Sequence, residues 1–463
     1  MMGYVRSLHA TGRPHRAQQG AATLVVVMVL FFIISLVAAY TSRNLIFEQR
    51  TSANQYRSTQ ALEAADAGLE WAVSMLNFGL IDTACVGLTA LPGTSFRQRY
   101  LELDKTSGKY LPLLDASGAP LTAACVNTLA GWTCSCPGAT GAPALTPPDA
   151  TKVWPAFLVR FSPAGAVGAA TVPTQPGAVR IEVVGCTRAD LTASASERCL
   201  SFDSRGALNE GRVFASTLVA LTGNPAGLPT AALTARGSVD VGGAALGAHN
   251  TAPSGLGITI HAGGAITPAG LDLRTAPGTP ATTSFIENDP SFTTSLVPIT
   301  GTSPFTTAER MFATVFNMRP ETYRTQQAAV QLTCPTSGCT AAAVKSAIDL
   351  NPGRPLWLSG DLIGDSTGSI GSVDEPVAIV VNGNLQFTTG GVTIHGLVYT
   401  RTSTWAVSGT GQVRGAVVAE GDVGVTGTPT GAPTIVYDAD VLRTLRYFSG
   451  TFVRVPGSWK DYP

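Results

Sequence analysis

One long apolar stretch near the N-terminus dominates the hydrophobic pattern of the chain. Between Gly20 and Arg43 the sequence AATLVVVMVLFFIISLVAAYTS contains no charged residue, and about 20 apolar residues suffice for a helix to span a bilayer. The chain then continues to Phe78 without a proline, and Gly68 is its one strong helix breaker, at a cost of about 1 kcal/mol relative to alanine. The pattern therefore predicts a single helix over residues 21–79 whose first half crosses a membrane.

The second half of this predicted helix is amphipathic. Apolar residues recur there at three- and four-residue steps, which places them on one helix face, and the acidic residues lie off that face. A signal anchor that packs only on its own domain is one interpretation, and a helix that also assembles into a fibre core is the other. The apolar positions are Ala61, Leu62, Ala65, Leu69, Ala72 and Leu76, and the acidic positions are Glu63, Asp66 and Glu70.

Composition and charge narrow the class of protein. The chain of 463 residues has a net charge of zero and only 13% charged residues, so nothing favours nucleic acid as a partner. Its 50 glycines, 30 prolines and 44% hydrophobic residues are typical of turn-rich β structure. Arg6, Arg13 and Arg16 precede the span and predict a cytoplasmic N-terminus. All eight cysteines follow it, which predicts that residues 43–463 are periplasmic or extracellular.

The order of these features carries a resemblance to a known family. A short basic leader ending in glycine, the apolar span and the segment FEQRTSANQYRSTQALEAADAGLEWA follow one another over residues 18–72. This region resembles that of PilX-type minor pilins of the type IV pilus. The resemblance implies that a prepilin peptidase cuts after Gly20 and that Ala21 becomes N-methylated. It also implies an inner-membrane assembly platform, the major pilin and other minor pilins as partners.

The fifth mature position departs from the pattern of major pilins. They carry a glutamate there, and this chain has Val25. A glutamate would compensate a neighbouring N-terminal ammonium inside an apolar fibre, where an unpaired charge costs several kcal/mol. A subunit without it suits the fibre tip, although Val25 is also an ordinary apolar membrane residue. The K-type tip pseudopilin of type II secretion shares this absence and remains the alternative.

The region of residues 80–222 reads as a disulfide-containing β domain. The segments WPAFLVRFSP, AVRIEVVGCT and GRVFASTLVAL are rich in β-branched and aromatic residues, and the resemblance implies that they form a small antiparallel sheet against the long helix. Cys186 and Cys199 are predicted to pair across a short loop. The remaining cysteines allow three connectivities, and their spacing does not favour zinc. They are Cys85, Cys125, Cys134 and Cys136.

The region of residues 223–463 is rich in Gly, Val and Thr, with turn signals every few residues. His395 begins HGLVYT and Arg414 begins RGAVVA, a separation of about one turn of a parallel β-solenoid. We predict a short parallel β-solenoid, with an irregular β-sandwich as the alternative. A helical insertion is expected at about residues 304–345, broken at Arg319–Pro320, with Cys334 and Cys339 closing a small loop. The predicted fold class is therefore α+β, a long pilin helix on a small antiparallel sheet followed by this β-rich domain.

The C-terminal segment carries a cluster of arginines and aromatic residues. One interpretation is that it covers the open end of the solenoid, whose last apolar turn must be hidden. The other is a docking patch for another tip protein, since Arg and aromatic residues dominate binding hot spots. The cluster comprises Arg443, Arg446, Tyr447, Phe448, Phe452, Arg454 and Trp459.

No arrangement of residues predicts an enzyme, a metal site or a cofactor. The carboxylates that come closest to forming a catalytic or calcium-binding group lie among Gly and Ser, where Asp commonly forms turns. A loop that binds calcium loosely remains an alternative. The histidines have no evident Ser or Cys partner. The prediction is a minor pilin that primes assembly, joins the fibre tip and displays its β domain for adhesion or for docking a large tip adhesin. A membrane-tethered carbohydrate-binding or carbohydrate-active β-helix is the alternative from another class. The residues concerned are Asp361, Asp365, Asp374, Glu375, His249, His261 and His395.

Overall fold

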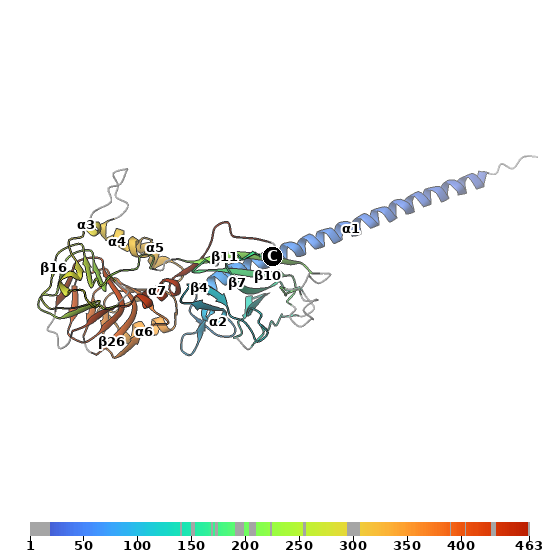
Figure 1. Cartoon of the computed structure of the whole chain (residues 1–463). Coiled ribbons are helices and arrows are strands. Elements are labelled where there is room, and N and C mark those ends of the chain that lie inside the picture. The colour runs from blue at the N-terminus through green and yellow to red at the C-terminus, as the bar shows by residue number, and fades with distance from the viewer. Residues whose placement is uncertain are drawn as a thin grey trace, which may run out of the picture. The chain divides into compact units, whose positions relative to one another are not determined.

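A computed structural model provides the structure of the chain (Figure 1). It divides into two compact units, residues 1–59 and 60–463, and each is described by itself. The described residues are 19–138, 141–149, 153–167, 170–171, 175–189, 199–202, 210–222, 225–252, 256–293, 306–388, 390–402, 404–426 and 432–461.

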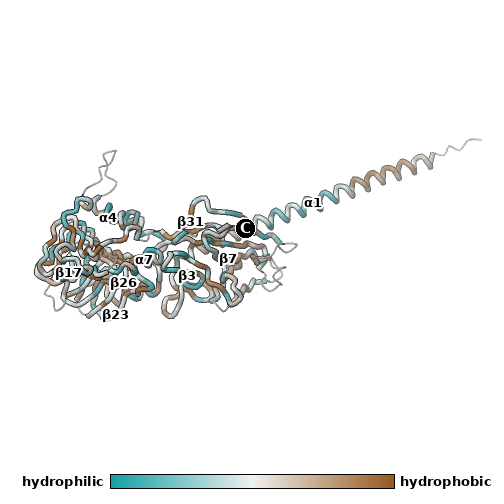
Figure 2. Tube along the Cα trace, viewed as in Figure 1, coloured by the Kyte–Doolittle hydropathy of each residue, from teal (hydrophilic) through white to brown (hydrophobic). Residues whose placement is uncertain are grey.

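The described part of the first unit is helical throughout. Helix α1 runs over Gln19–Leu76 and so continues into the second unit. Side chains from Ala22 to Arg50 are exposed, and Figure 2 shows the hydrophobic colouring concentrated in the first half of α1. The long N-terminal apolar helix predicted from the sequence is confirmed, with its end three residues before the predicted boundary at Gly79.

An antiparallel sheet forms the centre of the first β region in the second unit. In the described residues it has six strands in the order β31-β11-β10-β7-β5-β6, and the last turns of α1 pack in its core. We call residues 60–222 and 451–461 the head. The strands are β5 (Thr122–Thr128), β6 (Gly131–Ser135), β7 (Ala156–Pro163), β10 (Ala178–Cys186), β11 (Arg212–Thr222) and β31 (Thr451–Arg454). Smaller elements are β1 (Leu80–Ile81), β2 (Thr94–Ser95), α2 (Phe96–Tyr100), β3 (Leu101–Asp104), β4 (Lys109–Pro112), β8 (Ala166–Val167) and β9 (Ala170–Thr171).

Two glycines let α1 approach this sheet closely. A Cβ on Gly185 of β10 would lie 2.1 Å from the carbonyl oxygen of Ala61. A Cβ on Gly68 of α1 would lie 2.7 Å from Cγ1 of Val183. Both distances are shorter than van der Waals contact, so any side chain would force helix and sheet apart. Gly68, which costs helix propensity, is therefore required by packing.

The second β region consists of parallel strands stacked in successive turns. The larger sheet follows the order β17-β14-β30-β28-β26-β24-β21-β19 and the smaller one β16-β13-β29-β27-β25-β22-β20. His395 pairs with Arg414 one turn further along, and the interior is a continuous column made mainly of Val, Leu, Ile and Ala. This is the arrangement of a parallel β-solenoid, so the predicted fold class with its parallel sheets is confirmed. We call residues 231–437 the stack.

The strands of the stack fall into two groups along the chain. The first group is β12 (Leu233–Ala235), β13 (Val239–Asp240), β14 (Leu246–Asn250), β15 (Ile260–Ala262), β16 (Ile266–Thr267), β17 (Leu271–Thr275) and β18 (Phe285–Ile286). The second group is β19 (Val330–Thr333), β20 (Cys339–Thr340), β21 (Leu356–Ser359), β22 (Leu362–Gly364), β23 (Gly368–Ile370), β24 (Val377–Val381), β25 (Leu385–Phe387), β26 (Val392–Thr400), β27 (Thr404–Val407), β28 (Gln412–Ala419), β29 (Val423–Thr426) and β30 (Thr434–Tyr437).

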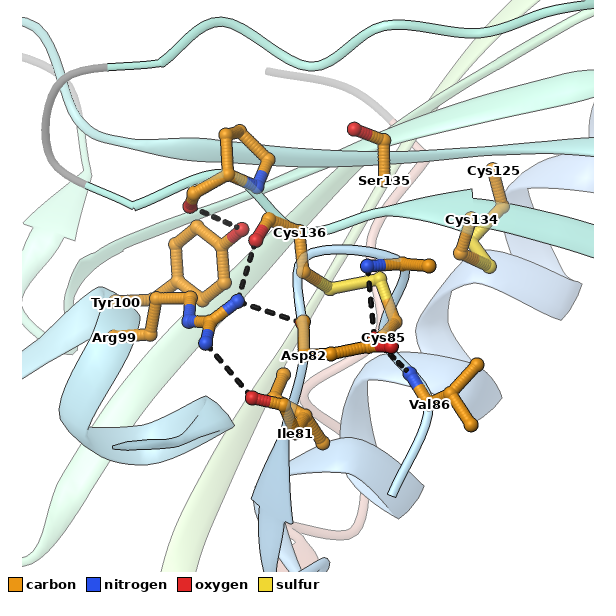
Figure 3. Close-up of a disulfide and its surroundings, with 12 residues drawn as sticks. Ile81, Asp82, Cys85, Val86, Arg99, Tyr100, Cys125, Cys134, Ser135 and Cys136 are labelled. Atoms are coloured by element: carbon orange, nitrogen blue, oxygen red, sulfur yellow. Dashed lines mark hydrogen bonds between the residues drawn. A yellow bond between two sulfur atoms is a disulfide. The ribbon is translucent and has the colours of Figure 1, made fainter. Parts of the chain in front are cut away.

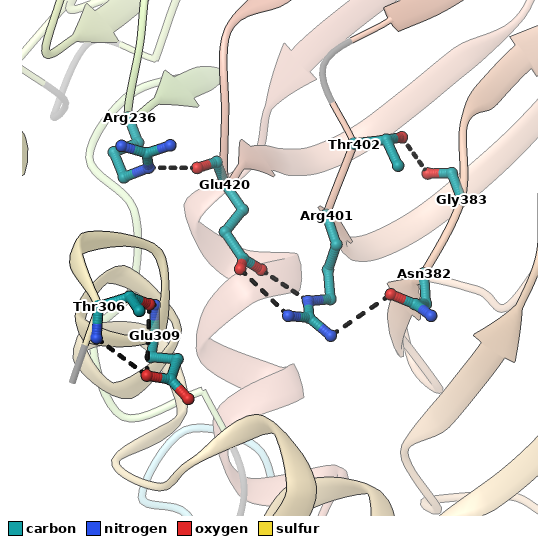
Figure 4. Close-up of polar contacts among 8 residues, drawn as sticks. All are labelled: Arg236, Thr306, Glu309, Asn382, Gly383, Arg401, Thr402 and Glu420. Carbon is teal, nitrogen blue, oxygen red and sulfur yellow. Dashed lines mark hydrogen bonds and ion pairs between the residues drawn. The ribbon is translucent and has the colours of Figure 1, made fainter. Parts of the chain in front are cut away.

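The order of turns in the stack differs from the order along the chain. Leu233 of β12 pairs with Val417 of β28, and Val239 of β13 pairs with Val423 of β29. The first turn in sequence therefore lies against the last. Polar contacts lie at this join, where Glu420 is 4% exposed and its Oε2 lies 2.9 Å from Nε of Arg401, on the same side of the join (Figure 4). Arg236 on the other side of the join donates to the carbonyl oxygen of Glu420.

Helices lie beside the stack. They are α3 (Pro290–Thr293), α4 (Thr307–Phe316), α5 (Pro320–Thr325), α6 (Ala341–Asp349) and α7 (Ala439–Phe448). The chain breaks between α4 and α5, where Pro320 takes the first helical position of α5. Residues 330–340 do not belong to a helical insertion, because β19 and β20 there pair with β21 and β22 as the turn at one end of the stack. A sequence window misses this, since such pairing is decided by residues more than 20 positions away.

The C-terminal segment returns to the head. β31 pairs antiparallel with β11, with Thr222 opposite Thr451, so residues 223–450 are an insertion between two neighbouring strands of the head sheet. Helix α7 packs against β26 and β28 on the flank of the stack. The segment therefore does not cover an open end of the stack, and the predicted second region of residues 223–463 includes a strand of the first.

Candidate functional site

The candidate site is helix α1 together with the residues that anchor its C-terminal end. Gly20 and Ala21 lie within the helix. Val25 is 58% exposed, and no charged residue occurs between it and Arg43. By length and composition the helix is apolar enough to cross a membrane. An exposed apolar helix of this kind must be covered by lipid or by other helices, because water solvates it poorly.

The buried face of α1 begins where the exposed apolar part has ended. Ala61, Ala65, Leu69, Ala72 and Leu76 are fully buried, as their spacing predicts. The stripe otherwise differs from the prediction. Leu62, which was predicted to belong to the stripe, is 38% exposed, whereas Ala64, Val73 and Met75 are buried. The acidic residues Glu63, Asp66 and Glu70 are exposed, as expected. Helix rotation against the sheet decides this, and small residues are selected where the strand backbone comes close.

Arg97 of α2 anchors the end of α1 and was not singled out by sequence reasoning. Its guanidinium donates to the carbonyl of Leu76, the last residue of α1. It also donates to the carbonyls of Gly353, 3.0 Å away, and Gly450, 2.7 Å away. Arg97 is 5% exposed, and burial lowers its pKa to about 10. One buried cation thus connects α1, the stack and the returning C-terminal segment. Its position is favourable because the free carbonyl groups at the C-terminal end of a helix attract positive charge.

Asn77 completes this anchor. Its Oδ1 accepts from the amide of Phe452 at 2.7 Å, and its Nδ2 donates to the carbonyl of Phe452 at 2.8 Å. The guanidinium carbon of Arg97 lies 4.7 Å from the centre of the Phe452 ring. The only sequence signal near Arg97 is the Ser95–Gln98 capping box that starts α2, and nothing in that motif identifies the arginine as buried.

Two disulfides lie in the head near α2 (Figure 3). Of the three open connectivities, the structure has Cys85 with Cys136 and Cys125 with Cys134. Arg99 donates to the carbonyl of Cys136 at 2.6 Å, which holds α2 beside the first disulfide. The other two disulfides are Cys186–Cys199 and Cys334–Cys339.

The predicted docking cluster is not one surface. Phe452 is fully buried in the head core, and Arg454 pairs with Glu70 of α1 at 2.7 Å. The remaining members lie on α7 or after β31. Arg443 pairs with Asp440, the Arg446 guanidinium lies 5.8 Å from the ring centre of Tyr447, Phe448 is half-buried and Trp459 is 48% exposed. The cluster is divided because β31 must enter the head sheet.

The acidic residues of the stack do not converge. Asp361 accepts from the amide of Asn384 and from the side chain of Gln386, and Asp365 accepts from the amide of Ala341 at the start of α6. Two further acids reach the head, where Asp374 pairs with Lys105 at 2.5 Å and Glu375 accepts from Gln98 at 2.7 Å. Each carboxylate therefore secures a turn or a contact between stack and head.

The histidines pair with aspartates or lie alone on a strand. His249 lies 3.0 Å from Asp272 and His261 lies 2.7 Å from Asp289, and burial lowers the pKa of His395. Within the described ranges, no group of three or more His, Cys, Asp and Glu side chains could hold a metal ion.

Comparison with known proteins identifies the N-terminal region. A family model described as PilX N-terminal matches residues 19–70. No curated protein matches the chain. Among solved structures it is similar to the crystal structure of the competence-associated pilin ComZ from Thermus thermophilus, at 10% identity over 88% of this chain and 97% of that chain. The TM-score of that match is 0.18, which is too low to indicate a shared fold. Residues 19–70 are therefore similar to the PilX N-terminal region.

Proposed function

We propose that the chain is a minor pilin of a type IV pilus. The observation that carries this proposal is that the two halves of α1 lie in different environments. Its first half is apolar, uncharged and exposed from Ala22 onwards, while its last turns are buried in the head. A membrane anchor alone needs no continuous helix that also forms the core of its domain. A subunit that leaves the membrane and enters a helical fibre core needs such a helix.

The match to the PilX N-terminal region supports the following processing steps. A prepilin peptidase cleaves after Gly20, and Ala21 is the methylated N-terminus of the mature chain. The apolar half of α1 holds the protein in the inner membrane until the assembly platform adds it to the fibre. Residues 43–463 then pass from the periplasm to the cell surface.

Val25 supports a position at the fibre tip. A subunit stacked beyond this one would find no carboxylate at the fifth mature position to compensate its N-terminal ammonium. The chain therefore helps other minor pilins to prime assembly and remains at the end of the growing fibre. Its stack, inserted between β11 and β31, serves as a displayed domain for adhesion or for docking a large tip adhesin. The role is structural and not enzymatic.

The first test is the mass of the mature N-terminal peptide from membrane and sheared-fibre fractions. A methylated Ala21 in both fractions is the expected result. A start near Tyr40 would indicate signal-peptidase release of a secreted β protein, and an uncut leader would leave only a tethered domain. Either result would overturn the proposal.

The tip position is tested by adding the missing carboxylate. In Val25→Glu fibres, labelled protein is expected along the shaft, because a further subunit can now stack beyond it. Val26→Glu is the matched control and should be lost from fibres, since its charge has no ammonium to meet. Wild-type protein distributed along the shaft would contradict the tip position, and recovery of the chain only from periplasmic pseudopili would favour the K-type pseudopilin.

A further inference from the structure

The two ends of the stack are finished differently. At the end formed by β19 and β20, helix α6 packs on the apolar column, with Val344 fully buried and Ala347 and Ile348 packed beside it. At the other end the last strands are β16, β17 and β18. The edge of β16 is closed by Glu287, whose Oε2 accepts from the amide of Ile266 at 3.0 Å.

Strand β17 has a free backbone edge at this end. The amide of Leu246 in β14 donates to the carbonyl of Gly270, and backbone groups of successive residues point to opposite sides of a strand. The amides and carbonyls of Asp272 and Arg274 therefore face β14, whereas those of Leu273 face outward. Among the described residues, no hydrogen bond reaches the backbone of Leu273 from a further strand. Such an edge is a template for another strand.

The apolar column is also incompletely covered beside this edge. Leu271, Leu273 and Phe285 pack on the column but are only partly buried, whereas Leu246, one turn further inside, is 1% exposed. Ile286 of β18 is 39% exposed. Apolar surface at the open end of a stack favours a partner that continues the sheet and covers it.

The charged side chains make β17 complementary to a second copy of itself. Asp272 and Arg274 are exposed and lie two positions apart, on one face of the strand. Antiparallel pairing centred on Leu273 places Asp272 of each copy opposite Arg274 of the other. These positions form non-hydrogen-bonded pairs, in which the side chains lie closest. Parallel pairing in register would place equal charges together.

The contacts that these side chains make within one chain are compatible with such pairing. Nη2 of Arg274 lies 3.1 Å from Oδ2 of Asp272, and the two side chains are 65% and 48% exposed. Nε2 of His249 lies 3.0 Å from the same oxygen. Exposed ion pairs contribute little to stability, so the arginine can be shared at low cost. The contacts of Asp272 within the described residues use Oδ2, and Oδ1 can therefore accept from Arg274 of the second copy.

We propose that two copies of this chain associate through β17, which pairs antiparallel with the same strand of the second copy. A twofold axis at Leu273 relates the two strands, so the same surface serves on both sides of the interface. The pairing continues the larger sheet from one stack into the other and covers the open ends of both columns. This association goes beyond the role in the pilus and does not depend on it.

The test measures the mass of the full chain in detergent micelles by sedimentation equilibrium. The wild type is expected to show an equilibrium between monomer and dimer. Arg274→Asp should weaken dimerisation about tenfold, because two pairs of opposite charges become pairs of like charges. Arg443→Asp changes an exposed arginine of α7 that also belongs to an ion pair, and it should leave the equilibrium as in the wild type.

A mixture of two variants tests the antiparallel arrangement. Asp272→Arg places two arginines on each strand and should dimerise as weakly by itself as Arg274→Asp does. Mixed in equal amounts, the two variants should form a heterodimer about as stable as the wild-type dimer, which native mass spectrometry detects when one variant is isotope-labelled. The proposal would be overturned by a monomeric wild type, by a dimer that Arg274→Asp leaves unchanged, as association through α1 would be, or by a mixture that associates no better than either variant alone.

Discussion

The head and the stack build their cores from different parts of the chain. The head buries Leu69 of α1 and Phe452 of β31 in one core, so it needs segments from both ends of the sequence. The stack buries a column from its own strands, in which each strand pairs with one about a turn away. Its contacts with the head are made by residues outside that column, such as Gly353, Asp374 and Glu375.

This difference explains how a large domain can be inserted in a small sheet. Thr222 and Thr451 are opposite each other in neighbouring strands, and the stack brings its two ends together at its own join. The entropic cost of closing a loop grows only slowly with its length, and a folded insertion with adjacent ends removes most of it. The head therefore keeps its sheet although 228 residues separate the two strands, since 450 − 222 = 228.

The largest change that tests this comparison is removal of the stack. A chain in which a two-residue turn replaces residues 223–450 should still form the head with its disulfides Cys85–Cys136 and Cys125–Cys134. Its stability should fall, because Arg97 loses the carbonyls of Gly353 and Gly450. Circular dichroism and disulfide mapping by mass spectrometry measure this outcome. The control also lacks residues 451–461 and should fail to fold, and equal folding of both chains would show that β31 is dispensable.

A cavity created by substitution in one core is expected to destabilise that region and not the other. Phe452→Ala in the head and Phe387→Ala in the stack each remove a buried ring and should cost about 3–5 kcal/mol. Amide hydrogen exchange should show lost protection in β10 and β11 for the first variant and in β24 and β26 for the second. Loss of protection across both regions in either variant would mean that head and stack unfold as one unit.

A smaller effect is expected from Arg97→Lys. An ammonium cannot reproduce the separate hydrogen bonds of the guanidinium, so buried carbonyls at the end of α1 lose partners and unfolding should become easier by about 2 kcal/mol. Thermal unfolding measures the change. Arg443→Lys, at an exposed position of α7, is the control and should change stability by less than about 0.5 kcal/mol. Equal effects of the two substitutions on thermal unfolding would show that Arg97 does not anchor the end of α1.

The smallest expected effect is the pH dependence of stability near β15 and β18, at one end of the stack. Hydrogen bonds from Ser291 hold the pKa of Asp289 below its usual value. The stabilisation is therefore present above the pKa of the unfolded chain, about 3.9, and is lost as the pH falls through the lower pKa of the folded state. Amide protection of β15 should therefore fall as the pH drops below about 4. In Asp289→Asn it should be lower at pH 5 and nearly independent of pH, and unchanged behaviour would contradict this assignment.

Much of the fold was predictable where the information is local. The 22 uncharged residues from Ala21 to Ser42 and the three- and four-residue steps after Ala61 predict one helix with two uses. The one-turn spacing of His395 and Arg414 predicts parallel pairing. The anchor was not predictable in the same way, because Arg97 looks like any arginine of a basic helix turn. Its role depends on Gly353 and Gly450, which are more than 250 positions away.

The sequence by itself determined the long helix, the β-rich character of the rest and the N-terminal family resemblance. Each of these depends on periodicity or on residues that are neighbours in the chain. Only the tertiary structure decided that β31 belongs to the head, that β12 lies against β28, and which cysteines pair. Strand pairing and burial depend on contacts between residues distant in sequence, and hydrophobic pattern is nearly the same for every register that buries the same face.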